Sequence, residues 1–168
     1  DYKFPMTVYS DEYLPAKGEL NRTEYNFDRF RLQLFQESPV YDTLLDNDLY
    51  PQFANSYLLL IGREQPEIKT LYAKFSNERD RHFDIRTEIS GTESGEKTVR
   101  KYPETEEASE HISRLEKISL NLSELYKESG ISVNKCKTGK NYAEFEFLNG
   151  ITLEEKLDTL LKEGKTDQ

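Results

Sequence analysis

The chain has 168 residues, of which 35% are hydrophobic and 33% are charged, and its mean hydropathy is -0.83. This hydrophobic content suffices for a folded core, whereas the net charge of -9 argues against a nucleic-acid partner, which clustered Lys and Arg would bind. No apolar run approaches the ~20 residues that cross a bilayer, and the start of the chain has no signal-peptide pattern, so a cytoplasmic location is expected.

The first 61 residues carry few signs of a complete domain. Tyr, Phe and Pro are frequent in residues 1–35, where a long ordered loop is expected. Apolar spacing predicts two short helices, at about 23–36 and 38–47, and the compact apolar run 55–61 predicts a buried strand. Because nothing nearby supplies a sheet for this strand, the chain reads as a piece of a longer protein. The unpaired strand would then form a homodimer or pack on its own loop.

From residue 68 onward, after a linker at 62–67, the pattern is that of an antiparallel meander. Alternating apolar residues predict three successive strands, at 71–75, 83–89 and 97–102. On the third of them Val99 and Lys101 share one face, which places a lysine on the inward side of the sheet.

A long amphipathic helix is expected from Pro103 to about Lys127, because its apolar residues recur at spacings of three and four. Two further strands are expected at 131–137 and 142–148, joined by a polar turn. The expected fold class is therefore α+β, with a five-stranded antiparallel sheet and one long helix packed on it.

A last amphipathic helix is expected in residues 151–168, ahead of a frayed tail. Thr152 and Glu155 have the spacing of a capping box, and leucines follow at helical intervals up to Gly164.

The order strand, strand, strand, long helix, strand, strand, hinge, helix over residues 68–164 resembles the small lobe of protein kinases and of their choline-kinase and aminoglycoside-kinase relatives. Three matches carry the resemblance. Val99-Arg100-Lys101 stands where the family has its third-strand lysine, the helix from Pro103 stands in the place of the regulatory helix, and Phe145–Gly150 stands as the fifth strand and hinge.

The resemblance implies ATP as the nucleotide. Lys101 would hold the phosphates of the donor, and a helix glutamate, Glu107 or Glu110, would orient the lysine. The other residues of the implied nucleotide site are Val99 in the base pocket, Ser76 and Asn77 over the phosphates, and Phe147, Leu148 and Asn149 at the hinge. A different interpretation of Lys101 is a lysine at a strand end that extends its ammonium to water.

The chain also departs from the kinase pattern. The turn at 76–80 has no glycine, although the family has a glycine-rich loop there, and Glu78 would repel a phosphate. The catalytic base and the metal ligands belong to the family's large lobe, which would follow residue 168. The chain alone is therefore expected to hold no catalytic or metal-binding residue and to bind ATP weakly or not at all.

Two stretches of residues 1–61, Asp1–Pro5 through Leu14-Pro15 and Phe53–Ile61, carry a second resemblance. They look, more weakly, like the C-terminal end of a class I methyltransferase domain that uses S-adenosylmethionine (SAM). With a kinase-like small lobe at 68–150, the chain looks like the junction of a bacterial methyltransferase–kinase fusion that modifies surface polysaccharide or lipopolysaccharide, sometimes beside glycosyltransferase domains. The implied partners are the remaining methyltransferase and large-lobe domains and a polysaccharide acceptor, and SAM would bind only in the parent protein.

Other interpretations are also open. The chain can be a non-catalytic interaction module built on a kinase-like remnant, or a small α+β domain whose likeness to kinases is accidental. Residues 1–61 can also be an extension packed on the lobe.

Overall fold

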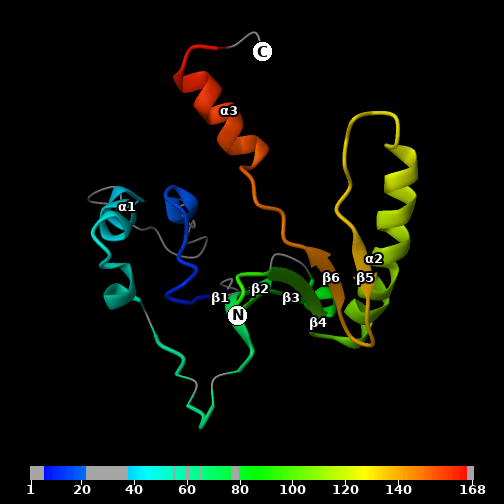
Figure 1. Ribbon diagram of the computed structural model, residues 1–168, viewed down its shortest axis with the longest axis horizontal. Coiled ribbons are helices and arrows are strands. Elements are labelled where there is room, and N and C mark those ends of the chain that lie inside the picture. The colour runs from blue at the N-terminus through cyan, green and yellow to red at the C-terminus, as the bar shows by residue number, and fades with distance from the viewer. Residues whose placement is uncertain are drawn as a thin grey trace.

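The computed structural model describes residues 6–21, 38–54, 56–59, 61–64, 66–76 and 80–165. The described part has an α+β fold, in which one open antiparallel sheet is combined with three α-helices (Figure 1). No helix among these residues is both long and apolar enough to span a membrane.

The sheet has six strands in the spatial order β1-β2-β3-β4-β6-β5, and every neighbouring pair is antiparallel. The strands are β1 (Met6–Tyr9), β2 (Ile68–Ser76), β3 (Ile85–Thr92), β4 (Lys97–Pro103), β5 (Cys136–Thr138) and β6 (Ala143–Glu146). Strand β6 lies between β4 and β5, so the chain leaves β4 through a helix, forms the outer strand β5 and then returns to pair with β4.

The expectation of five strands is wrong, because β1 adds a sixth. Residues 6–9 pair with β2 in a register that places Tyr9 opposite Tyr72 and Thr7 opposite Lys74. The N-terminal segment therefore extends the same sheet that residues 68–148 were expected to form alone.

The strand expected at 55–61 is also not formed. Residues 56–59 and 61, the described part of this run, have no regular structure, and Leu58, Leu59 and Ile61 are largely exposed. The side of β2 with which such a strand could have paired is taken instead by β1. A homodimer through this run stays a prediction.

Two other boundaries differ from the expectation, and one expected helix is not tested. Phe83 belongs to a short 3-10 helix, Arg81–Phe83, so β3 begins only at Ile85. Of the strand expected at 131–137, only its end pairs, in β5. The helix expected from 23 to 36 lies outside the described residues.

The three α-helices are α1 (Ser38–Asp46), α2 (Glu106–Leu125) and α3 (Leu153–Lys162). Helix α1 confirms the helix expected at 38–47. Helix α2 begins three residues later than expected, because the Thr105 side chain accepts a hydrogen bond from the Ala108 amide and so caps the helix. Pro103 instead ends β4.

Helix α2 packs on one face of the sheet, as the sequence predicts, over β4, β5 and β6 (Figure 1). Its buried side chains, Ala108 and Ile112, meet Ile85 and Ala143 from the strands and Cys136 from β5. Burial, with the charge of Glu116, raises the pKa of the Cys136 thiol.

The capping box at the start of α3 is confirmed, since Thr152 and Glu155 exchange both of its hydrogen bonds. The helix itself extends away from the sheet (Figure 1). Its leucines Leu153, Leu157 and Leu161 are 74%, 48% and 63% exposed, so the described residues leave most of its apolar stripe uncovered.

Glu116 of α2 is hydrogen-bonded to the short strand β5. Its carboxylate accepts hydrogen bonds from the Thr138 hydroxyl and the Thr138 amide, and these bonds, helped by the charge of Lys137, lower the pKa of Glu116. When folding lowers the pKa of a carboxyl, the charged carboxyl stabilises the fold at any pH above the pKa of the unfolded state, about 4.3 for Glu. This stabilisation is lost as the pH falls through the pKa of the folded state.

We expect Glu116→Gln to cost stability at neutral pH and to cost less as the pH falls toward 3, because the wild type loses its advantage when Glu116 is protonated. Urea unfolding of both proteins at a series of pH values measures this. Glu124→Gln, an exposed substitution on the same helix, serves as the control. A penalty for Glu116→Gln that does not change with pH would contradict the assignment.

Candidate functional site

Lys101 lies on the face of the sheet that α2 covers. In the sheet register Lys101 stands opposite Thr87 on one side and Ala143 on the other. Ala143 is fully buried in the core beneath α2, and residues directly opposite one another share a face. The Lys101 side chain is half-buried, and its Nζ lies 6.0 Å from the ring centroid of Phe145.

Val99 lies on the same face, one step further along β4. Its cross-strand neighbours are Ile89 of β3 and Phe145 of β6. The row continues through Tyr72 of β2 to Tyr9 of β1. The helix-facing side of the sheet thus has an apolar and aromatic band next to the lysine, which is a suitable surface for a flat ring.

The two candidate glutamates lie in the first turns of α2 and make other contacts there. The Glu107 carboxylate lies 3.3 Å from Nδ1 of His82, and Glu110 forms an ion pair with Arg114. Both ion pairs are largely exposed, so each contributes little to stability. His111 is half-buried at the edge of the apolar stripe.

The remaining expected residues are spread over the ends of the strands. Ser76 is the last residue of β2 and stands opposite Ile85, while Asn77 lies outside the described residues. Phe147 follows β6 and is half-buried, whereas Leu148 and Asn149 are exposed in an irregular segment.

An aromatic cluster that the sequence pattern does not reveal lies on this face, near Phe147. The Tyr72 ring lies 5.4 Å from the ring of Tyr9 and 5.7 Å from that of Tyr13, and Tyr13 in turn lies 6.5 Å from Phe147. Burial, with the charge of Glu19, raises the pKa of Tyr72 to about 12. These tyrosines come from the N-terminal segment and from β2, so only the pairing of β1 with β2 brings them together.

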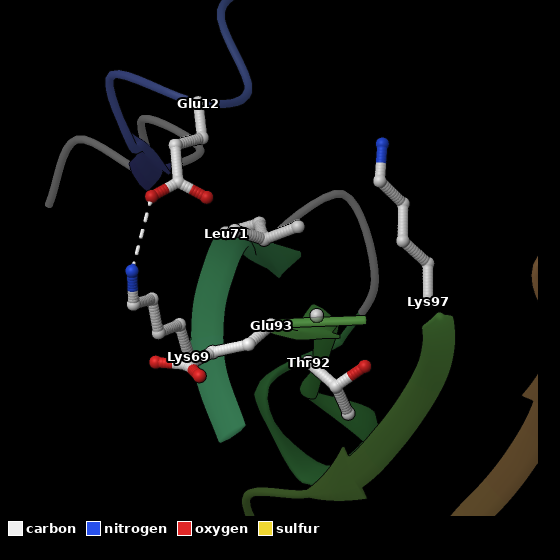
Figure 2. A pocket seen from close by; sticks show the side chains of 7 residues that line it. Glu12, Lys69, Leu71, Thr92, Glu93 and Lys97 are labelled. Carbon is white, nitrogen blue, oxygen red and sulfur yellow. Dashed lines mark hydrogen bonds and ion pairs between the residues drawn. The ribbon is translucent and has the colours of Figure 1, made fainter. Parts of the chain in front are cut away.

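A pocket of about 290 Å³ is lined by Lys97, which contacts the rings of Tyr13 and Phe147 in this cluster. Figure 2 shows the residues that line it. Lys69, Gly91 and Lys97 are direct cross-strand neighbours in it. Lys69 forms an ion pair with Glu12 at 3.2 Å on one side, and Lys97 stands on the other side (Figure 2). The alternation of Lys97, Val99 and Lys101 could have identified Lys97 from the sequence, whereas Glu12 carried no such signal.

Comparison with known proteins adds no relative. No protein-family model, no curated protein and no solved structure matches the chain. Chemically, the face combines a half-buried cation at Lys101, an apolar band at Val99 and a small charged pocket at Lys97, all along one strand. Such a row suits a ligand that has an anionic end and a flat apolar end.

Proposed function

We propose that the chain is the nucleotide-binding small lobe of a kinase-like transferase, in which Lys101 holds the phosphates of ATP. The observation that carries the proposal is the place of Lys101, half-buried on a central strand and on the face covered by α2. A phosphoryl donor needs a cation held at a fixed position, and a central strand is a rigid support for one.

The glutamates of α2 supply the second part of the proposed site. Glu107 is exposed and lies beside an exposed histidine, so a change of rotamer can turn its carboxylate toward Lys101 when a nucleotide is bound. Glu110 is the other candidate.

The adenine ring of ATP would lie against Val99 and Ile89, with its edge at the backbone of residues 147–149. Val99 is half-buried and Ile89 buried, so both offer apolar surface beside Lys101. Ser76 and Asn77, at the turn after β2, would cover the phosphates.

The wider proposal places this lobe in a cytoplasmic bacterial transferase of surface-polysaccharide or lipopolysaccharide synthesis. Residues 1–61 would belong to a methyltransferase end that binds SAM elsewhere in a longer protein. The kinase large lobe and a polysaccharide acceptor would be the other partners. This part depends on the resemblance described above.

The exposed leucines of α3 favour a second function, that of a non-catalytic interaction module. Leu153, Leu157 and Leu161 form an apolar stripe at helical spacing, and Ile151 before the helix is also exposed. Such a module would bind other domains without binding ATP, and the same titration separates the two functions.

The test is a titration of the ¹⁵N-labelled chain with Mg-ATP and with adenosine, followed by NMR. We expect weak, saturable shifts at the amides of Val99, Lys101 and residues 147–149. Lys101→Met should weaken ATP binding by about tenfold and leave adenosine binding unchanged, because it removes only the phosphate contact. Lys137→Met, a change of an exposed lysine on β5, is the matched control. Equal ATP binding by Lys101→Met and by the wild type would refute the role of Lys101 in the nucleotide site and favour the interaction module.

A further inference from the structure

The pocket at Lys97 is formed by parts of the chain that are far apart in sequence. Glu12 comes from the turn after β1, whereas Lys69, Gly91 and Lys97 come from three adjacent strands. The turn is held against the sheet by the Glu12–Lys69 ion pair and by a hydrogen bond from the Ser10 amide to the Leu71 carbonyl. The pocket is therefore a product of the tertiary fold.

Gly91 leaves room for an apolar side chain at the floor of the pocket. A Cβ at this position would lie 2.8 Å from Cδ1 of Leu71, so the Leu71 side chain occupies the space over the glycine. Leu71 is buried and lines the pocket. With a volume of about 290 Å³, the pocket is at the lower end of the range for small-molecule sites, about 300–1,000 Å³.

Within the part of the chain that the structure describes, the ammonium of Lys97 is the cation of this pocket without an acidic partner. Its Nζ lies 5.2 Å from the ring centroids of both Tyr13 and Phe147. The faces of aromatic rings attract a cation, but they do not neutralise its charge or accept strong hydrogen bonds. Among the described residues no carboxylate forms an ion pair with Lys97, whereas Lys69 across the pocket is paired with Glu12.

The acidic groups of the pocket restrict the ligand further. Glu12 and Glu93 contribute carboxylates that accept hydrogen bonds from hydroxyl groups and repel a second negative charge. The net charge of -9 also disfavours a polyanion. The lining thus suits one anionic group near Lys97 and several hydroxyls toward Glu12 and Glu93.

We propose that this pocket binds a hydroxylated monocarboxylate about the size of one sugar ring, with its carboxylate on Lys97 and its hydroxyls toward Glu12 and Glu93. The site is separate from the proposed phosphate site. Lys97 and Lys101 are four residues apart on one strand, a distance of about 13 Å at the rise of a β-strand. The proposal therefore does not rest on nucleotide binding.

The experiment is an NMR titration of the ¹⁵N-labelled chain with glucuronate. Acetate, which lacks the hydroxyls, glucose, which lacks the charge, and glucose 6-phosphate, which carries a higher charge, are titrated in parallel. We expect saturable shifts of the Gly91, Thr92 and Lys97 amides with glucuronate, and binding that is at least about tenfold weaker for each of the other three.

Variants of Lys97 complete the test. Lys97→Met should weaken glucuronate binding by at least about tenfold and Lys97→Arg by much less, because Arg keeps the positive charge. Lys101→Met should leave glucuronate binding unchanged, which separates this site from the nucleotide site. Undetectable glucuronate binding, equal binding of acetate or glucose, or unchanged binding by Lys97→Met would each overturn the proposal. Preferential binding of glucose 6-phosphate would overturn the restriction to a single charge.

Discussion

Replacing Ile112 by alanine should destabilise the chain by about 3 kcal/mol, the middle of the range for such substitutions in protein cores. Ile112 is 2% exposed and packs, together with Ala108 of α2, against Ile85, Cys136 and Ala143 of the sheet. Few of the described side chains are so fully buried. The substitution therefore leaves a cavity in the small core between α2 and the sheet. Urea unfolding, followed by circular dichroism, measures the loss.

Ile118→Ala is the matched control, since it makes the same chemical change on the same helix at a side chain that is 43% exposed. It should cost less than about 1 kcal/mol. Equal losses for the two variants would mean that α2 is not fixed to the sheet through Ile112.

Replacing Ala143 by leucine should destabilise the chain by about 1–3 kcal/mol, in this case through overpacking. Ala143 is completely buried in β6 and faces α2, so a larger side chain must push the helix or the strand outward. Because Ala143 stands opposite Lys101, we expect the amide signal of Lys101 to shift as well. Urea unfolding and an NMR spectrum of the variant measure the two effects.

Glu146→Leu, three residues along the same strand, introduces the same side chain at an exposed position. Its effect on the free energy of unfolding should be within about 0.5 kcal/mol. If Ala143→Leu changed the free energy of unfolding as little as this control, the inferred tight contact between β6 and α2 would be refuted.

Local sequence pattern predicted those parts of the fold that depend on neighbouring residues. The spacing of apolar residues identified α1 and α2, and the capping-box residues located the start of α3. Alternation along β4 assigned Val99 and Lys101 to one face, because side chains of a strand alternate strictly between its two faces.

The errors concern segments whose state depends on distant partners. The apolar run 55–61 has the composition of a strand, but its described residues have no regular structure. The less apolar Met6–Tyr9 takes the edge of β2 and becomes β1. The paired residues of β1 and β2 are more than 60 positions apart in the sequence. Which segment pairs with β2 depends on every segment that could pair there, and a local window of sequence does not contain that information.

The same division holds for the candidate site. Sequence alone determined the inward lysine of β4, the acidic first turns of α2 and the net negative charge that disfavours nucleic acid. Only the tertiary structure decided that Tyr9 and Tyr13 lie beside Tyr72, and that Glu12 closes a pocket over Lys69 and Lys97. The physical reason is that alternation within one strand determines on which face of the sheet a side chain lies. A pocket, in contrast, requires several strands in a specific order and register.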